Sequence, residues 1–257
     1  MSLSVIPIRA FNDNYIWAIV HPEKKQIIVV DPGDAKPAIH FLKEYHYQLS
    51  GILITHHHHD HTGGINTLQQ HFDCPTYGPH NSPDRQYTFS VNDGDTIDLP
   101  QFNLKLNVIE IPGHTLDHIA FYNDEWLFCG DTLFAAGCGR VFEGTPKQML
   151  SSLDKLAALS PSLQIFCGHE YTLNNLQFAA TLEPNNKALQ HCIQKSQLLL
   201  GDNKPTLPTL LGDELTYNPF LRCRKNTIIT AANRLSQQHC KTPVDVFTAI
   251  REEKNKH

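Results

Sequence analysis

The sequence lacks the features that mark several large classes of protein. No stretch approaches the roughly 18 uninterrupted apolar residues of a membrane-spanning helix, and no charged segment followed by an apolar one opens the chain as in a secretory signal. No run of basic residues could follow a phosphate backbone, and 21 basic residues stand against 26 acidic ones. We therefore expect a cytoplasmic protein without membrane or nucleic-acid partners, and we expect it to be a monomer.

Common catalytic and structural motifs are also missing. The seven cysteines are scattered and form no CxxC pair, which argues against a disulfide framework or a thiolate zinc site. No GxSxG sequence supports a catalytic serine, and the glycines of residues 137–139 lack the strand, helix and lysine of a phosphate-binding loop. Covalent serine chemistry and nucleotide binding therefore have no support.

The hydrophobic pattern divides the chain into two parts. Short apolar segments bounded by turn residues predict a strand-rich part with a few helices in residues 1–165, and helical spacing predicts a smaller helical domain in residues 166–257. The predicted strands are 4–8, 14–21, 26–30, 51–55, 75–77, 95–99, 103–110, 118–123, 125–129 and 165–167. The predicted helices are 37–47, 65–71, 146–159, 171–182, 185–200, 227–238 and a last one from 243, with irregular links at 205–211 and 217–220. The fold class is α+β, with mixed sheets covered by helices.

The feature that indicates chemistry is a histidine run at the end of a buried strand. Residues 55–61 read Thr-His-His-His-His-Asp-His and follow the apolar segment 51–55. Imidazole and carboxylate together suit zinc, iron or manganese better than calcium or magnesium. If the chain stays extended, His56 and His58 point to one side, while His57 and His59 point to the other and are expected to be exposed or to support the ligands.

Three more polar residues end apolar strands in the same way. His114, Asp131 and His169 each follow a strand and a glycine. The total of five histidines and two carboxylates exceeds the needs of one tetrahedral ion but suits two ions that share a carboxylate and a hydroxide. We assign one ion to His56, His58 and His114, the other to Asp60, His61 and His169, and Asp131 to both. Such a hydroxide is a nucleophile at neutral pH, so the pattern predicts hydrolysis with Asp60 and Asp131 in catalytic roles.

One further carboxylate follows the strand 26–30. Asp31 precedes Pro32 and Gly33 and has two interpretations of equal weight: it orients a ligand imidazole, or it only begins a turn.

These motifs resemble a known superfamily. Residues 55–61 resemble the HxHxDH signature of the metallo-β-lactamase superfamily, and residues 112–114, 130–131 and 168–169 match its later metal positions in order. The resemblance implies an αββα sandwich of two mixed sheets flanked by helices, with the metals at one edge.

Within that superfamily the chain is similar to glyoxalase II, the hydroxyacylglutathione hydrolases. The similar segments are residues 131–140, 143–145, 168–172, 217–220 and 251–254. The resemblance implies a binuclear hydrolase, with zinc favoured over iron or manganese. Its substrate would be S-D-lactoylglutathione or a related thioester, cleaved to glutathione and D-lactate in the second step of methylglyoxal detoxification.

The resemblance also implies which residues bind glutathione. Arg140 stands where the family usually has lysine, Phe142 stands where some members have a glutathione-binding tyrosine, and Tyr171 is retained. Arg251 and Lys254 would hold the glycine carboxylate of glutathione. Two alternatives are a persulfide dioxygenase of the same superfamily with a single iron, and a metal-binding module without activity.

Overall fold

The computed structural model describes residues 2–83, 87–237 and 239–257. The chain forms two compact units, one of Met1–Glu110 with Asp117–Gly130, the other of Ile111–Leu116 with Asp131–His257. The predicted domain boundary between residues 165 and 166 stays a prediction.

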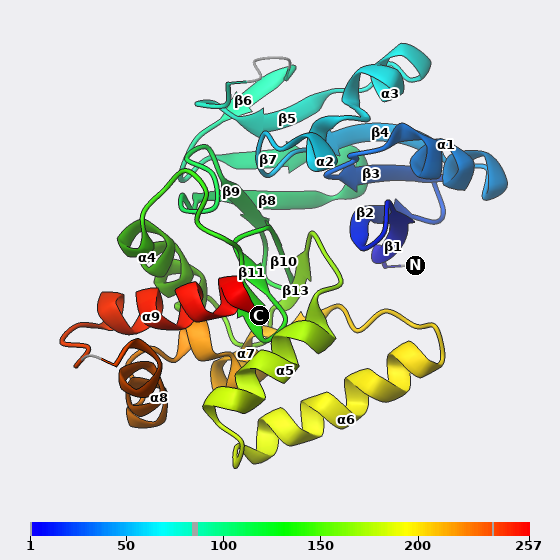
Figure 1. The fold of residues 1–257 in the computed structure, drawn as a ribbon. Coiled ribbons are helices and arrows are strands. Elements are labelled where there is room, and N and C mark those ends of the chain that lie inside the picture. Colours follow the sequence, from blue (N-terminus) through cyan, green and yellow to red (C-terminus); the bar gives the residue numbers. More distant parts are fainter. Residues whose placement is uncertain (1, 84–86, 238) are drawn as a thin grey trace. The chain divides into compact units, whose positions relative to one another are not determined.

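The first unit contains a complete six-stranded mixed sheet (Figure 1). Its strands are β1 (Ser4–Ala10), β2 (Asn14–His21), β3 (Gln26–Val30), β4 (Gln48–Leu53), β5 (Thr76–Pro79) and β6 (Phe89–Val91), in that order. The β1–β2–β3 pairs are antiparallel, and β3 to β6 are parallel. Every residue of β2 except the last is buried, because both faces of the sheet are covered.

Two helices cover one face of this sheet. They are α1 (Ala35–Glu44) and α3 (Ile65–His71), whose buried residues Ala38, Leu42, Ile65 and Leu68 join one hydrophobic core with alternate residues of the strands. The helix predicted at 37–47 starts earlier because the Asp34 carboxylate accepts from the Lys36 amide as an N-cap. It ends earlier because His46 has a φ of 56°, outside the helical region.

A second set of strands in the same unit is antiparallel throughout. It comprises β7 (Thr96–Leu99), β8 (Leu104–Glu110), β9 (Ile119–Tyr122) and β10 (Trp126–Gly130), with the 3-10 turn η1 (Pro100–Phe102) between the first two. The Ile119 amide donates to the Thr55 carbonyl over 2.9 Å, which ties β9 to the chain that follows β4. This contact fixes the histidine run against β9.

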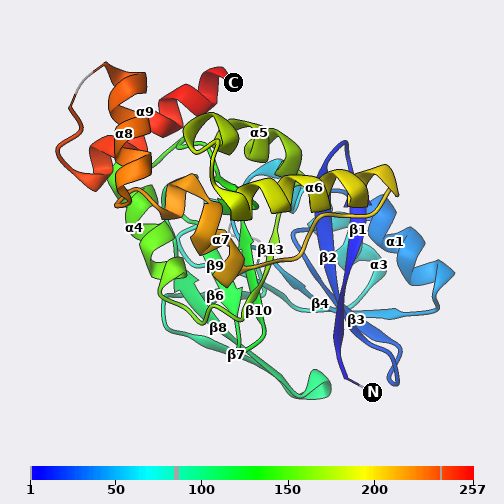
Figure 2. The same ribbon diagram turned by 90° about the horizontal axis from the view of Figure 1, so that it is seen from below.

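The second unit is mainly helical. Its helices are α4 (Pro146–Ala157), α5 (Thr172–Leu182), α6 (Lys187–Gly201), α7 (Leu211–Tyr217), α8 (Asn226–Ser236) and α9 (Pro243–Lys256), with η2 (Pro219–Leu221) before α8. Figures 1 and 2 show α5 beside α6 and α8 beside α9. Two short antiparallel pairs complete it: β11 (Leu133–Phe134) with β12 (Gly137–Cys138), and β13 (Gln164–Cys167) with β14 (Thr209–Leu210).

Most predicted elements are confirmed within a few residues, and the differences have physical reasons. Residues 211–217 were expected to lie in or beside irregular links, but they form α7, in which Glu214 is buried against distant groups. The predictions did not include β6, β11, β12 or β14, each of which is short. The predicted helix 227–238 ends at Ser236 in α8, and residue 238 lies outside the described residues. Among the helices described, none is long and apolar enough to cross a membrane.

Candidate metal and substrate site

The histidine run begins in an extended segment and ends in a helical turn. The strand β4 stops at Leu53, and α2 (His59–Thr62) begins four residues after Thr55. The rings of His56 and His58 lie with centroids 4.9 Å apart, and those of His56 and His61 lie 4.2 Å apart. His56 and His61 are buried, and His59 is exposed. The turn at α2 therefore brings His61 back beside the histidines of the extended segment.

Asp31 organises these rings. One of its carboxylate oxygens accepts from the Thr55 amide over 2.8 Å, and the other accepts from the Thr55 hydroxyl over 2.7 Å and from His61 Nδ1 over 3.0 Å. Since the Thr55 hydrogen is directed to Asp31, the hydroxyl oxygen accepts from His56 Nδ1 at 3.0 Å. In both rings Nδ1 carries the proton, so Nε2 carries the lone pair that a metal needs.

Asp60 is held from the other side by the start of β2. Asn14 Nδ2 donates to Asp60 Oδ2 over 3.1 Å, and that carboxylate oxygen lies 3.6 Å from His61 Nε2. The backbone is close here as well, because a Cβ on Gly33 would lie 1.8 Å from the Asp60 carbonyl oxygen. Glycine at position 33 is therefore required for the turn to sit against the strand ends.

Two neighbours of the run were not found by the sequence analysis. His57 Nδ1 donates to the buried Asp117 over 2.9 Å, and the buried His118 stacks on His56 with centroids 4.5 Å apart and planes at 12°. Their one signal in the sequence is their position directly before the apolar run of β9. These contacts give His57 a structural partner and help to fix the His56 ring.

The second unit holds the other three predicted ligands, and all three are buried. His114 Nδ1 donates to the Arg140 carbonyl over 2.9 Å, which again leaves the lone pair on Nε2. The Nε2 atoms of His114 and His169 lie 3.5 Å and 3.2 Å from Asp131 Oδ2. Two imidazole nitrogens directed at one carboxylate oxygen form a donor set that fits a divalent cation of the zinc, iron or manganese type.

The predicted aromatic substrate residues lie beside these ligands in the same unit. Tyr171 stacks on His169 with centroids 4.7 Å apart and planes at 6°, and its ring meets Phe134 edge-on at 5.2 Å. Phe142 meets His114 edge-on at 5.2 Å and is 62 % exposed, while Arg140 is exposed as well. Exposed aromatic rings against the imidazoles of predicted ligands suit contact with a substrate.

The predicted cationic pair is buried on the inner face of α9. Arg251 Nη1 donates to the Cys138 carbonyl over 2.8 Å and its guanidinium lies over the Phe220 ring. Lys254 Nζ donates to the carbonyl and the side-chain oxygen of Asn174. Burial, and next the charges of Arg251 and Arg140, lower the pKa of Lys254 to about 8. The helix end is thus ordered, and its two cations share a region of excess positive charge.

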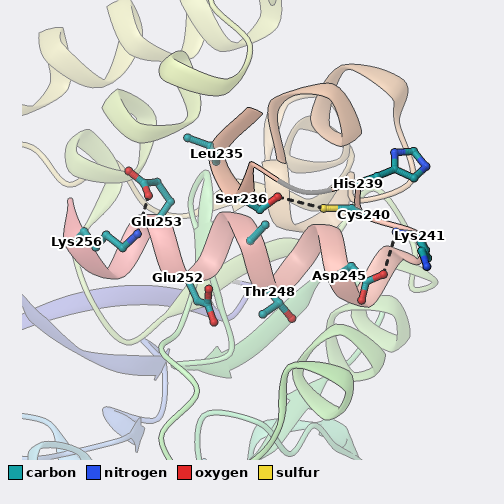
Figure 3. A pocket seen from close by; sticks show the side chains of 11 residues that line it. Leu235, Ser236, His239, Cys240, Lys241, Asp245, Thr248, Glu252, Glu253 and Lys256 are labelled. Carbon is teal, nitrogen blue, oxygen red and sulfur yellow. Dashed lines mark hydrogen bonds and ion pairs between the residues drawn. The ribbon is translucent and has the colours of Figure 1, made fainter. Parts of the chain in front are cut away.

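The outer face of α9 is different in kind. It lines a cavity of about 550 Å³, shown in Figure 3, between the end of α8 and α9. Some of its charged groups have local partners: Lys256 Nζ lies 3.1 Å from a Glu253 oxygen, and the Asp245 carboxylate accepts from the Lys241 backbone amide over 2.9 Å. The inner face of α9, and not this cavity, therefore carries the cations predicted to bind substrate.

Comparison with known proteins places the chain in a family. Residues 11–169 match the model of the metallo-beta-lactamase superfamily, and residues 170–257 match the model described as hydroxyacylglutathione hydrolase C-terminus. The chain is 49 % identical to the hydroxyacylglutathione hydrolase of Nitrosomonas eutropha over 98 % of each chain. It is 47 % identical to the enzyme of the same name from Hahella chejuensis over 96 % of each chain.

A solved structure supports the fold class. The crystal structure of ETHE1 from Myxococcus xanthus matches with a TM-score of 0.65 at 20 % identity, covering 99 % of this chain and 98 % of that one. The predicted fold class, two mixed sheets with flanking helices and a helical C-terminal region, is confirmed. The chain belongs to the hydroxyacylglutathione hydrolase family of the metallo-β-lactamase superfamily.

Proposed function

We propose that this chain hydrolyses S-D-lactoylglutathione and related S-2-hydroxyacylglutathiones to glutathione and D-lactate or its analogues, the second step of methylglyoxal detoxification. The observation that carries the proposal is a shared feature of the two units: imidazoles whose Nδ1 atoms donate to protein acceptors, so that Nε2 presents a lone pair to a cation. Family membership over almost the whole chain adds the glutathione thioester as the substrate.

The donor set supports two divalent ions. We assign the first to His56, His58, His114 and Asp131, and the second to Asp60, His61, His169 and Asp131. Zinc is our proposal for both, since imidazole and carboxylate donors accept it along with iron and manganese. When bound, the ions supply a hydroxide nucleophile at neutral pH and polarise the thioester carbonyl.

The chain's own residues hold these groups and move the proton. Asp31 fixes the tautomer of His61 directly and that of His56 through Thr55. Asn14 orients the Asp60 carboxylate, and we assign to Asp60 Oδ2 the proton given up by the attacking water. Water adds across the acyl carbon–sulfur bond: its oxygen joins the acyl carbon, and glutathione leaves as the thiolate and takes up a proton.

The positive charge of the second unit supports binding of glutathione. Burial lowers the pKa of Lys254, and the nearby charges of Arg251 and Arg140 lower it further. An anion placed among them offsets this repulsion, and the glycine carboxylate of glutathione is such an anion. Tyr171 adds a hydroxyl near His169, whereas Phe142 has no hydrogen-bonding group to offer. The monomeric state and the cytoplasmic location stay predictions.

A thioesterase assay on S-D-lactoylglutathione, with zinc, iron and manganese quantified in the same sample, tests the proposal. We expect turnover that scales with metal content up to two ions per chain. A fully dimetallated protein that leaves the thioester intact would refute the function and favour a non-catalytic module. Oxygen consumption with a glutathione persulfide by a protein holding one iron would instead favour the dioxygenase.

A further inference from the structure

The short hairpin β11–β12 connects predicted ligands and substrate residues within the second unit. Asp131 lies two residues before the hairpin, and Arg140 lies two residues after it. The two ends are close, since a Cβ on Gly139 would lie 1.9 Å from the Asp131 carbonyl oxygen. The Arg140 carbonyl in turn accepts from His114. The path of this hairpin therefore determines where Asp131 and Arg140 lie.

The turn of the hairpin is not one that its sequence favours. Ala135 and Ala136 form the two-residue connection, and Ala136 has a φ of 53°. Left-handed backbone costs an alanine roughly 1–2 kcal/mol, and such turns usually contain glycine, asparagine or aspartate. Both alanines are buried. Contacts from outside the hairpin must hold this conformation.

Those contacts come from side chains of the helical region. Asn175, Asn218 and Arg251 donate to hairpin carbonyls: Asn175 to that of Ala135, Asn218 to those of Phe134 and Gly137, and Arg251 to that of Cys138. The Ala136 amide at the tip is different, because it donates, over 2.7 Å, to the carboxylate of Glu214 on α7.

Glu214 joins the tip to the rest of this network. It is fully buried, and the oxygen that accepts from Ala136 also accepts from Asn218 over 3.0 Å, while the other accepts from the Tyr217 hydroxyl over 2.8 Å. These donors are neutral, and burial raises the pKa of Glu214 to about 7. A buried carboxyl without a cationic partner is costly, whereas an apolar side chain would pack there without that cost.

We propose that Glu214 is a positioning residue for the reaction: by holding the Ala136 amide, it sets the hairpin and so places Arg140 and Asp131 for the glutathione thioester. The inference rests on the proposed function. Among the described residues, Glu214 hydrogen-bonds to Ala136, Tyr217 and Asn218 and not to a predicted ligand, so its effect on the site is exerted through the backbone of residues 133–138.

The test compares Glu214→Ala with a matched control, Glu183→Ala. Glu183 is also a nearly buried carboxylate of the helical region, but its partners Arg222, Thr227 and Asn186 lie outside the hairpin. We expect Glu214→Ala to raise the KM for S-D-lactoylglutathione at least fivefold at unchanged metal content, and to speed amide hydrogen exchange in residues 133–139. Glu183→Ala, at a comparable loss of thermal stability, should leave both unchanged.

Glu214→Gln supplies the conservative variant and guards against a misfolded alanine variant. Its amide oxygen can still accept from Ala136 and Asn218, and the Tyr217 hydroxyl can rotate to accept from its NH₂ group. We expect the KM of Glu214→Gln and its rate of amide hydrogen exchange in residues 133–139 to stay within twofold of the parent protein. A KM within twofold of the parent in Glu214→Ala, or an equal rise in Glu183→Ala, overturns the inference. Absence of thioesterase activity in the parent protein would instead refute the proposed function, and unchanged exchange in Glu214→Ala would then overturn the hairpin role separately.

Discussion

The two units organise their candidate ligands by different means. In the first unit the ligands lie within residues 56–61, and the Asp31 and Thr55 side chains at neighbouring strand ends fix their rings. In the second unit His114, Asp131 and His169 are far apart in the sequence, and the hairpin that follows Asp131 depends on side chains of α5, α7 and α9 and on Asn218, which lies between α7 and η2. A local motif can thus specify one group of candidate ligands, while the other group depends on the packing of a whole helical region.

The largest effect is expected where both predicted ion sites share a ligand. Asp131→Ala removes the carboxylate that lies within 3.5 Å of the Nε2 atoms of both His114 and His169. We expect the activity to fall by at least about 1000-fold, more than for loss of one oxyanion-hole donor, and the bound metal to fall below two ions per chain. Steady-state kinetics and elemental analysis of the same preparation measure both. Full turnover with both ions retained would defeat the assignment of Asp131.

The next effect tests the predicted ligands of the first unit. Asp31→Asn keeps the shape and tolerates the φ of 54° at this position. The amide side chain of this variant has one acceptor oxygen in place of two, so it cannot accept from the Thr55 amide, the Thr55 hydroxyl and His61 Nδ1 together. The tautomer of His61 is then no longer fixed. We expect metal affinity to fall by about 10- to 100-fold, as is usual when a group that orients a ligand is lost.

A competition titration with a chelator measures this affinity. Asp34→Asn is the control, because the same substitution three residues later alters only the N-cap of α1. An Asp31→Asn protein that binds metal as tightly as the control would leave Asp31 with the role of a turn residue.

The contrast between the units also explains what the sequence could reveal of the site. His56, His114, Asp131 and His169 were recognisable because each follows an apolar strand, and a strand end directs polar side chains to one edge of a sheet. Nothing in Glu214 distinguishes it from an exposed helix residue, since its partner Ala136 is distant in sequence and the bond is made by a backbone amide. Burial of a carboxyl by remote packing leaves no local pattern.

The same reason limits prediction of the fold. Long strands such as β2 and β8 show their burial in continuous or alternating apolar residues, and they were predicted within one residue. The two-residue strands β11 and β12 are too short for any period, and the Ala135–Ala136 turn lacks the usual turn residues. Their conformation is a property of the helices that hold them.

A smaller effect, dependent on pH, probes the cationic region. Because the pKa of Lys254 is lowered to about 8, its ammonium is charged below that pH and is lost above it. The kcat/KM of the parent protein for S-D-lactoylglutathione should therefore fall as the pH rises through about 8. Lys254→Met should lower kcat/KM by about tenfold or more below that pH and only slightly above it. A tenfold loss is within the range expected for a charge-assisted hydrogen bond.

Two controls isolate the carboxylate that Lys254 is proposed to bind. Lys254→Arg stays charged throughout and should lose the pH dependence. A thioester with an amide in place of the glycine carboxylate should be hydrolysed with the same kcat/KM by the parent protein and by Lys254→Met at every pH. If Lys254→Met loses as much with that amide substrate, the residue does not bind the carboxylate.

The smallest effect on activity is expected at the second histidine–aspartate pair of the first unit. The pairs His57–Asp117 and His61–Asp31 have nearly the same geometry, because the distance from histidine Nδ1 to the nearest carboxylate oxygen is 2.9 Å in the first and 3.0 Å in the second. Only His61 is assigned to a metal, so Asp117→Asn should change kcat/KM and metal affinity by less than about threefold. The amide oxygen can still accept from His57, but replacing a charge-assisted bond by a neutral one lowers the free energy of unfolding by about 1 kcal/mol. Chemical denaturation and chelator titration, run beside Asp31→Asn, separate the two pairs. A loss of metal affinity equal to that of Asp31→Asn would show that His57 takes part in metal binding. A hydrogen bond from Nδ1 to a carboxylate would then be enough to identify a histidine ligand in this run.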